Sequence, residues 1–271
     1  MDEKTKNQVK KIKILAKEIR KDVLKMSFKM QTAHLASSLS CVDIISTIYE
    51  SFLKITNNYL HNLKRNRFIL SKGHAATTLY SVLFRKRIIS EKVFKSFCKP
   101  NSLLEEHPSP KTKGVECATG SLGHGFPVAC GIALGNKIKK IKSNIYVLIS
   151  DGECNEGTTW EAAMFASSQK LNNLKLIVDY NKWQATGRSN KILSLAPLTK
   201  KFESFGWKVF EINGHNINEL IKTLNYSSVK KPTAIIANTI KGKGVSFMED
   251  NNNWHYKSPN KEELITSLKN L

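Results

Sequence analysis

Long hydrophobic runs are absent from this sequence: no apolar stretch approaches the ~20 residues that would span a bilayer. The amino terminus, MDEKTKNQVKK, is charged and leads into no apolar stretch, so we expect neither a secretory signal nor a transit peptide. Cysteine is scarce, with five residues, an odd number, and no CxxC spacing. We therefore expect a cytoplasmic protein with reduced, structural cysteines at positions 41, 98, 117, 130 and 154.

Acidic residues are few: 22 stand against 43 basic ones, which gives a formal net charge of +21. A charge of this size raises the question of nucleic acid or an anionic membrane as a partner. Only six of the basic residues are arginine, however, although arginine is favoured in the recognition of phosphates and bases. The lysines are spread along the chain and form no motif. We therefore expect neither nucleic acid nor membrane as a partner, and anionic small molecules remain candidate ligands.

Regular elements are predicted along most of the 271 residues, a length that buries a sizeable core without disulfides. A long amphipathic helix is expected over 9–26, where apolar residues recur at helical spacing. Further helices are expected at 41–55, 74–87, 91–98, 125–140, 157–170, 197–205, 216–227 and 261–269, and short apolar strands at 68–70, 145–150, 174–180, 207–212 and 233–240. This alternation predicts a single α/β domain over 1–271, with a mostly parallel sheet covered by helices on both faces.

Residues 101–123 have prolines and glycines but little periodicity, which predicts a long loop, and such loops in compact domains are usually functional. Other conspicuous side chains are expected to be structural. Trp160, Met164 and Phe165 recur at helical spacing, so we expect them to pack in the core. His61 and His215 are expected in surface loops.

Polar residues follow two neighbouring strands at the points where these end. Ser150-Asp151-Gly152-Glu153 comes after one apolar strand, and Asp179-Tyr180-Asn181 ends the next. Ligands of open parallel sheets bind beyond the carboxyl ends of the strands, where free N–H groups attract anions. A carboxylate there is repelled unless a cation lies between, so Asp151 and Asn181 suggest a divalent cation that holds a diphosphate. From the residues alone, the alternative is that both side chains cap helices and turns.

A resemblance to a known family favours the first interpretation. The stretch from Ser150 to Gly187, SDGECNEG…NKWQATG, is similar to the thiamine-diphosphate motif of transketolases. Three more blocks resemble transketolases in the same order: FILSKGHAATTLY at 68–80, GVECATGSLGHG at 114–125 and KGKG…NWHYKSP at 241–259. The resemblance covers nearly the whole chain and corresponds to the amino-terminal, diphosphate-binding half of the family. It implies the thiamine-diphosphate-binding fold.

The resemblance also implies a set of site residues. Asp151, Asn181 and the backbone carbonyl of Trp183 would bind Mg²⁺ or Ca²⁺. Contacts with thiamine diphosphate would come from residues around its diphosphate and rings: Lys72, His74, Gly120, Ser121, Leu122, Asp151, Gly152, Glu153, Asn181, Lys241 and His255.

Five positions are implied in catalysis. His34 and His107 match histidines that hydrogen-bond sugar hydroxyls and assist proton transfer, a role that the near-neutral pKa of imidazole suits. His74 and His255 match positions near the reacting carbon. Glu156 matches an acid that hydrogen-bonds across a subunit interface to the glutamate that activates the cofactor.

The chain departs from the family pattern at four positions. Ala33 and Leu35 replace the usual Gly and Pro around the first histidine, Ser150 replaces the common Gly before the aspartate, and His124 stands where Gln is frequent. These changes put the identity of the substrate in question more than cofactor binding.

The function that the resemblance implies is that of the amino-terminal subunit of a split, thiamine-diphosphate- and Mg-dependent transketolase. It would transfer a two-carbon ketol unit from a ketose or its phosphate to an aldose, together with a carboxyl-terminal-half subunit in an α₂β₂ assembly. The alternatives among enzymes are the α subunit of a 2-oxo acid dehydrogenase and a deoxyxylulose-phosphate synthase; His34, His107 and the block SKGHAATTLY distinguish the chain from both. Outside enzymes the alternative is a non-catalytic homologue, against which the intact Asp151 and Asn181 argue.

Overall fold

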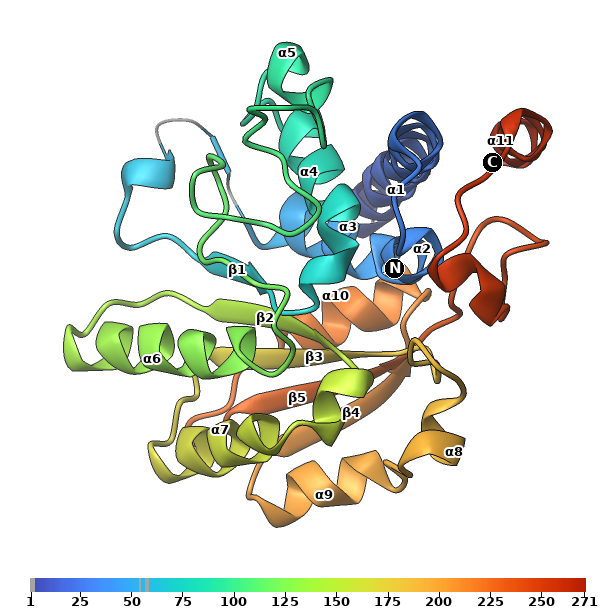
Figure 1. Ribbon diagram of the computed structural model, residues 1–271. Coiled ribbons are helices and arrows are strands. Elements are labelled where there is room, and N and C mark those ends of the chain that lie inside the picture. Colours follow the sequence, from blue (N-terminus) through green and yellow to red (C-terminus); the bar gives the residue numbers. More distant parts are fainter. Residues whose placement is uncertain (1–2, 54, 57–58) are drawn as a thin grey trace.

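The computed structural model describes residues 3–53, 55–56 and 59–271. Within them lies a five-stranded sheet in which every neighbouring pair is parallel, in the order β1-β2-β3-β5-β4. The strands are β1 (Arg67–Leu70), β2 (Ile145–Ser150), β3 (Leu174–Tyr180), β4 (Lys208–Asn213) and β5 (Thr233–Asn238). The parallel sheet expected from the sequence is confirmed, and Figure 1 shows it as one layer with helices on both sides.

The helices form one layer over each face of the sheet. One layer contains α1 (Glu3–Met30), α3 (Val42–Ser51), α4 (Ala76–Arg85) and α10 (Ile217–Asn225). The other contains α6 (Gly125–Ile138), α7 (Gly157–Ser168) and α9 (Leu198–Ser204). Shorter or flanking helices are α2 (Leu35–Ser40), α5 (Glu91–Phe94), α8 (Ser189–Ile192) and α11 (Lys261–Asn270), the last of which contacts α1.

The inner strands β2, β3 and β5 are mostly apolar because their side chains alternate between two cores, whereas the edge strand β4 is largely exposed. On β3, Ile177 belongs to the core shared with α1, α3 and α4, whereas Leu176 and Val178 belong to the core shared with α6, α7 and α9. All three side chains are completely buried. Burial of each such side chain contributes ~1.5–3 kcal/mol, so a parallel sheet covered on both sides selects uninterrupted apolar strands.

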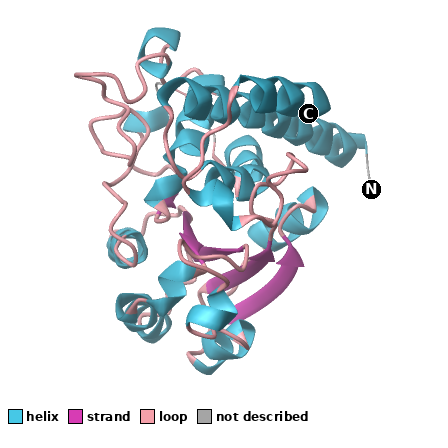
Figure 2. Ribbon diagram, turned by 45° about the vertical axis from the view of Figure 1, so that its right-hand side comes forward, coloured by secondary structure: helices cyan, strands magenta, loops and turns pink. Residues whose placement is uncertain are grey.

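The carboxyl ends of the strands meet at one edge of the sheet, and the turns that leave it there carry most of the polar residues expected at the site. Lys72 follows β1, Asp151 follows β2, Asn181 follows β3 and Lys241 follows β5. Figure 2 shows the strands as a twisted layer with helices and loops around it. Segments far apart in the sequence are therefore brought together at this edge.

Two helix boundaries differ from those expected. The helix expected at 41–55 is α3, which is preceded by the separate short helix α2, and Lys54 of the expected helix lies outside the described residues. The helix expected at 91–98 is confined to the single turn of α5; turns follow it, and the backbone enters the left-handed region at Cys98, with a φ of 52°.

The long loop expected at 101–123 is confirmed, since these residues are all described and contain no helix or strand. β5 is shorter than expected and ends at Asn238. The next residue, Thr239, still donates its main-chain N–H to Tyr180 of β3, and its hydroxyl donates to Asp179.

The expectation that α7 buries its large apolar side chains is wrong for two of the three. Met164 is 50% exposed and Phe165 is 41% exposed, because small alanines occupy the core-facing positions of α7. Trp160 does pack, against Phe202 and Phe205 of the α9 region. An outer face of α7 thus presents large apolar side chains.

His61 is exposed, as expected, whereas the expectation for His215 is wrong. The His215 side chain is only 11% exposed, because it is enclosed between the carboxylate of Asp43 and the main chain at Ile240.

All five cysteines are free thiols, as expected; Cys41, Cys130 and Cys154 are buried, and Cys98 and Cys117 are partly exposed. In the part of the chain that the structure describes, no helix combines the length and the apolar character needed to cross a membrane.

Candidate active site

A cleft of about 320 Å³ opens at the carboxyl edge of the sheet. Its walls come from the turn before α2, the segment after β1, the 101–123 loop, the turns after β2 and β3, and the segment around residue 255. The residues expected at the site that line this cleft are His34, His74, His107, Gly120, Leu122, Gly152, Glu156, Asn181, Trp183 and His255.

Four of these residues are histidines that lie around one point. The centroid of the His34 ring is 5.4 Å from that of His74, 6.2 Å from that of His107 and 5.1 Å from that of His255. The main-chain N–H of His34 donates to the carbonyl of His255 at 2.6 Å. The four histidines expected to act on substrate or cofactor, from four separate segments, thus form one cluster.

Three of these histidines are held in the neutral form. Burial first, and then the neighbouring charge of Lys241, lower the pKa of His255 to about 3. The pKa of His74 lies well below its ordinary value, first through burial and then through Lys72. Burial also lowers the pKa of His34, against the attraction of the Glu106 carboxylate 3.6 Å away. Neutral imidazoles both donate and accept hydrogen bonds, which suits them to bind hydroxyl groups.

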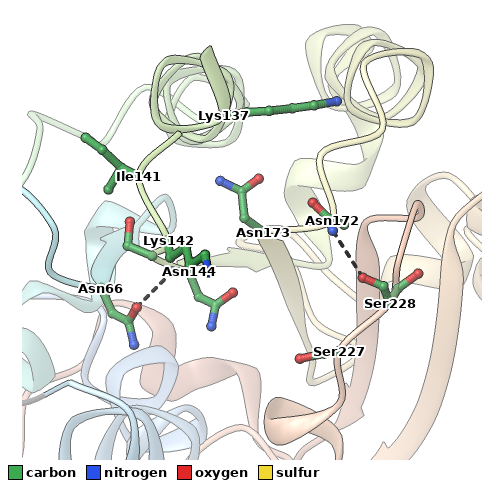
Figure 3. A pocket seen from close by; sticks show the side chains of 10 residues that line it. Asn66, Lys137, Ile141, Lys142, Asn144, Asn172, Asn173, Ser227 and Ser228 are labelled. Carbon is green, nitrogen blue, oxygen red and sulfur yellow. Dashed lines mark hydrogen bonds between the residues drawn. The ribbon is translucent and has the colours of Figure 1, made fainter. Parts of the chain in front are cut away.

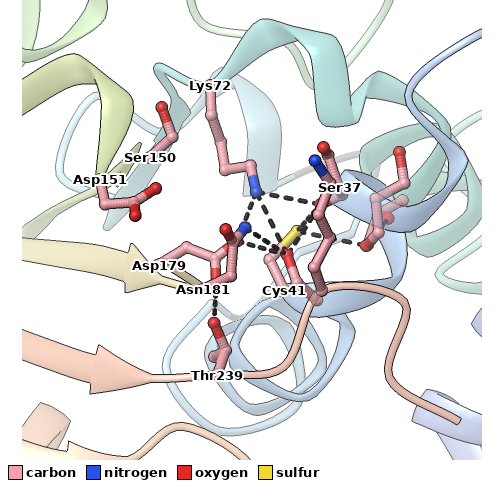
Figure 4. Close-up of polar contacts among 12 residues, drawn as sticks. Ser37, Cys41, Lys72, Ser150, Asp151, Asp179, Asn181 and Thr239 are labelled. Carbon is pink, nitrogen blue, oxygen red and sulfur yellow. Dashed lines mark hydrogen bonds and ion pairs between the residues drawn. The ribbon is translucent and has the colours of Figure 1, made fainter. Parts of the chain in front are cut away.

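Lys72 and Asp179 form a buried ion pair at the same edge of the sheet (Figure 4). Neither side chain has exposed surface. The Lys72 ammonium also donates to the carbonyl of Ser37 at 3.0 Å, and Asp179 accepts from the hydroxyls of Ser40 and Thr239. Burial alone would lower the pKa of Lys72, but the charge and hydrogen bond of Asp179, together with the nearby Cys41 and Asp151, outweigh burial and raise the pKa above its ordinary value. Because buried charges are tolerated only when paired and hydrogen-bonded, this network fixes the ends of β1, β3 and β5 against α2.

Asp151 and Asn181 directly follow the paired strands β2 and β3 and lie close together in Figure 4. The Asp151 carboxylate is completely buried and accepts from the Ser189 hydroxyl at 2.7 Å and the Gly152 N–H at 3.1 Å. Burial raises the pKa of Asp151 to about 7, against the opposing hydrogen bond from Ser189. An acid that is this difficult to ionise would be stabilised as the carboxylate by a bound cation.

The donors at this point fit a hard cation. They are the Asp151 carboxylate, the Asn181 side-chain amide and the main chain at Trp183. The N–H of Trp183 donates to Asn181 Oδ1 at 3.0 Å, which holds the Trp183 backbone against the Asn181 side chain. Among the described residues, no group of three or more His, Cys, Asp or Glu side chains is arranged to hold a metal. A cation here would depend on amide and carbonyl oxygens beside Asp151, which is the chemistry that Mg²⁺ and Ca²⁺ accept.

Lys241 is the second buried lysine of the site. Its ammonium donates to Asn252 Oδ1 at 2.6 Å and contacts His255 Nδ1 at 2.8 Å. Burial lowers the pKa of Lys241 to about 7, and the charge of Lys72 acts in the same direction. The ammonium can only donate, so His255 Nδ1 accepts and the proton of the neutral ring lies on Nε2.

Glu153 supports the loop below the cleft and does not line it. Its buried carboxylate accepts from the Gly123 N–H at 3.1 Å, the Ser150 N–H at 2.8 Å and the Ser71 hydroxyl. These contacts join the 101–123 loop to the ends of β1 and β2. A direct contact of Glu153 with the cofactor stays a prediction.

Gly73, between Lys72 and His74, has no room for a side chain. A Cβ atom there would lie 2.6 Å from the main-chain nitrogen of Gly120. We expect Gly73→Ala to push the Gly120 loop away from the cleft and to lower the free energy of unfolding by ~1–3 kcal/mol, measured by chemical denaturation. Gly131→Ala on α6, where an added Cβ meets no atom within 4 Å, is the control and should be neutral or stabilising. Equal losses for both variants would contradict this close approach.

A second cleft, of about 370 Å³, lies at the opposite edge of the sheet, where the strands begin (Figure 3). Its lining consists of Asn66, Lys137, Ile141, Lys142, Ser143, Asn144, Asn172, Asn173, Ser227 and Ser228. This lining contains no histidine, cysteine or carboxylate. Of these two clefts, the one at the carboxyl edge is therefore the one with groups suited to acid–base chemistry.

Comparison with known proteins identifies the family. The family model described as transketolase, thiamine diphosphate binding domain, matches residues 6–271. The chain belongs to the transketolase family.

Its relatives include separate subunits as well as full-length enzymes. An apulose-4-phosphate transketolase subunit of Phocaeicola vulgatus is 36% identical over 267 residues, which cover 97% of this chain and 95% of that protein. The 6-deoxy-6-sulfo-D-fructose transketolase subunit SqwG of Clostridium sp. is 38% identical over 237 residues, 86% of each chain. Human transketolase is 35% identical over 247 residues, which cover 91% of this chain but 40% of the enzyme.

A solved structure gives the same correspondence. Transketolase from Campylobacter jejuni has a TM-score of 0.86 and 30% identity, covering 97% of this chain and 42% of that one. The chain therefore corresponds to the amino-terminal part of full-length transketolases and spans less than half of their length. It matches the apulose-4-phosphate transketolase subunits, which belong to split enzymes, nearly from end to end.

In this transketolase domain, the expected site residues fall into three groups. Ten line the cleft, as given above. Lys72, Asp151, Glu153 and Lys241 are completely buried outside its lining, and the ammonium groups of both lysines already have protein acceptors. Ser121 is exposed and lies outside the cleft lining.

The departures from the transketolase pattern have local consequences. Between Ala33 and Leu35, the backbone of His34 is left-handed, with a φ of 67°, which turns the chain into α2 and keeps the imidazole in the cluster. Ser150 is the last residue of β2 and remains extended. His124 is exposed, and its Nδ1 contacts the carbonyl of Leu122 at 3.1 Å.

Several residues of this transketolase site have no distinct signal in the sequence. In the sequence, Asp179 is recognisable only as part of a strand end, yet its carboxylate pairs with Lys72 and accepts a hydrogen bond from Thr239. Ser189 donates to Asp151, and Asn252 accepts from Lys241. These contacts depend on packing between distant segments, so sequence spacing does not predict them.

Proposed function

We propose that this chain is the amino-terminal subunit of a split transketolase that binds thiamine diphosphate through Mg²⁺ and transfers a two-carbon ketol unit between sugars. The donor would be a ketose or ketose phosphate and the acceptor an aldose or aldose phosphate. The enzyme would be cytoplasmic and would need a carboxyl-half subunit, in an α₂β₂ assembly, with neither nucleic acid nor membrane as a partner.

The observation that carries this proposal is the cluster of four histidines in the cleft that Asn181 and Gly152, the neighbour of Asp151, also line. A thiamine enzyme that acts on a 2-oxo acid has no polyol chain to bind. A sugar, in contrast, presents several hydroxyls, and neutral imidazoles can donate to and accept from them. The cluster therefore favours a sugar substrate over the 2-oxo acid alternative.

The chain's own residues have distinct tasks in this scheme. Asp151, Asn181 and the Trp183 carbonyl would hold Mg²⁺, which would anchor the diphosphate. Thiamine diphosphate, when bound, supplies a nucleophilic carbon able to cleave the bond next to a ketose carbonyl. His34 and His107 would bind sugar hydroxyls and move protons, while Lys241 holds the His255 ring in place through Nδ1.

The exposed side of α7 supports the need for a partner. Met164 and Phe165 are large apolar residues at its surface, and the exposed Glu156 precedes the same helix. Exposed apolar groups of this kind mark protein interfaces. We assign this face to the carboxyl-half partner, against which Glu156 would contact the cofactor-activating glutamate.

The experiment that tests the function is co-expression of the chain with a transketolase carboxyl-half subunit, followed by assays of the purified complex. The donor panel includes common ketose phosphates together with apulose 4-phosphate and 6-deoxy-6-sulfo-fructose, the sugars in the names of two of the relatives. We expect ketol transfer that depends on thiamine diphosphate and Mg²⁺. Decarboxylation of 2-oxo acids without ketol transfer would contradict the proposal.

Replacement of His107 by alanine should affect sugar chemistry more than cofactor binding. His107 and His34 both line the cleft, and the centroids of their rings lie 6.2 Å apart. We expect kcat/KM for ketol transfer to fall by ~10²-fold or more, with little change in thiamine-diphosphate affinity. Steady-state kinetics at saturating cofactor measures kcat/KM, and calorimetry measures the affinity for thiamine diphosphate. Loss of cofactor binding with normal kinetics at saturation would show that His107 serves the cofactor.

A further inference from the structure

His215 lies in the turn after β4, behind the cleft, and its two ring nitrogens have different partners. The main-chain N–H of Ile240 donates to Nε2 at 2.9 Å. Nδ1 is 2.8 Å from Asp43 Oδ2. Because Nε2 accepts, the proton of the neutral ring lies on Nδ1 and is donated to Asp43.

Asp43 connects this ring to a third element. Its carboxylate, on α3, accepts two hydrogen bonds from the guanidinium of Arg20 on α1, at 3.1 and 2.6 Å. Burial opposes ionisation, but the hydrogen bond from His215 and the charge of Arg20 outweigh it and lower the pKa of Asp43 to about 2. Arg20, Asp43 and His215 thus form one buried, charged and hydrogen-bonded unit.

This unit holds the main chain on both sides of Lys241. His215 binds the N–H of Ile240, the preceding residue, and Arg20 Nε donates to the carbonyl of Lys243 at 3.1 Å. The turn that carries His215 also packs closely: a Cβ on Gly214 would lie 2.5 Å from a methyl group of Thr239. The backbone from 239 to 243 therefore has little freedom to move.

We propose that Arg20, Asp43 and His215 form a positioning network that fixes the backbone on either side of Lys241, so that its ammonium is held at His255 and the diphosphate side of the cleft. The inference rests on the proposed function, because it assumes that a diphosphate binds there. None of the three residues touches the cleft, so they act through the main chain and not on the substrate.

The matched controls come from α1 itself. Asp22 is buried two residues from Arg20 and forms an equivalent pair with Arg85 on α4, away from Lys241. Asp22→Asn and Asp43→Asn therefore remove similar ion pairs, but only the second belongs to the network. At His215, glutamine can keep both contacts, since its amide donates and accepts, whereas alanine removes both.

The experiment uses the full chain with magnesium pyrophosphate as the probe, titrated by calorimetry, together with amide exchange of Ile240 by NMR without the probe. We expect His215→Ala and Asp43→Asn to speed exchange at Ile240 and to weaken probe binding by ~10-fold or more. His215→Gln and Asp22→Asn should stay within ~3-fold of the unaltered chain. On a Lys241→Met background, His215→Ala should cause no further loss of affinity.

Unchanged probe affinity in His215→Ala, or a loss in Asp22→Asn equal to that in Asp43→Asn, would overturn the positioning role. Additive losses from His215→Ala and Lys241→Met would also overturn it. Failure of the unaltered chain to bind magnesium pyrophosphate would instead show that the diphosphate site is wrong, and the positioning role would fall with it.

Discussion

Asp151→Ala is expected to abolish the activity of the assembled enzyme, by at least ~10³-fold, because it removes the one carboxylate that would hold the cation. The other two donors expected there, the Asn181 amide and the Trp183 carbonyl, are uncharged. Without Asp151 they would face the diphosphate with no formal charge to retain Mg²⁺. Steady-state assays across a range of thiamine diphosphate and Mg²⁺ concentrations check this. Near-normal activity, saturating over the same cofactor range, would contradict the metal site.

Asp151→Asn supplies a control that separates loss of function from loss of fold. Burial raises the pKa of Asp151 from 3.8 to about 7. Since the folded chain holds this proton more tightly than the unfolded chain, the group stabilises the fold at low pH and loses that contribution as the pH rises towards 7.

Without divalent cations at pH 8, the melting temperature of Asp151→Asn should therefore be at least ~2 °C above that of the unaltered chain. At pH 4 the two melting temperatures should be equal. Added Mg²⁺ and thiamine diphosphate should stabilise only the unaltered protein and reverse the order. Equal melting temperatures at pH 8 would show that ionisation of the buried Asp151 carboxylate does not destabilise the fold.

The isolated chain is expected to show no ketol transfer. It spans 42% of the length of Campylobacter jejuni transketolase, and the family resemblance implies that the glutamate that activates the cofactor belongs to the other half. The chain's own site supplies oxygen donors and histidines, but a thiamine ring must also be held and protonated from the opposite side. The partner is therefore expected to raise activity from background to the full rate.

The outer face of α7 gives this expectation a structural test. Phe165, which is 41% exposed, would be buried against the partner, so Phe165→Glu should prevent assembly without unfolding the chain. Ile265→Glu is the matched control, because Ile265 is 57% exposed and lies on α11, which packs on α1 on the other side of the sheet from α7 (Figure 1). Sedimentation of each variant with the partner measures assembly. Normal assembly of Phe165→Glu would place the interface elsewhere.

Much of the fold was predictable because strand and helix signals are local. The apolar runs of β2 and β3 and the polar residues directly after them, Asp151 and Asn181, can be recognised from the sequence. The parallel arrangement then brings these residues to one edge. The histidines are different, because no local pattern predicts that His34 and His255 lie in contact. Only the family resemblance placed them in the same site.

The errors have a common physical cause. Met164 and Phe165 belong to an apolar pattern at helical spacing, but both are exposed. Periodicity alone does not tell whether an apolar face of a helix packs against the same chain or is left for a partner. His215 sits among polar residues in a turn, so its sequence context is that of a surface loop. Its burial results from long-range packing of α1, α3 and the turn after β4 around a shared carboxylate.

The measurement that tests the central claim most directly is a titration of the purified chain, free of other transketolase subunits by mass spectrometry, with a carboxyl-half subunit. Ketol transfer is recorded at fixed thiamine diphosphate and Mg²⁺. We predict no transfer at zero partner and a rate that rises to a plateau at one partner per chain. Robust transfer by the chain alone, or none at any partner concentration while Asp151-dependent cofactor binding persists, would contradict the assignment to a split transketolase.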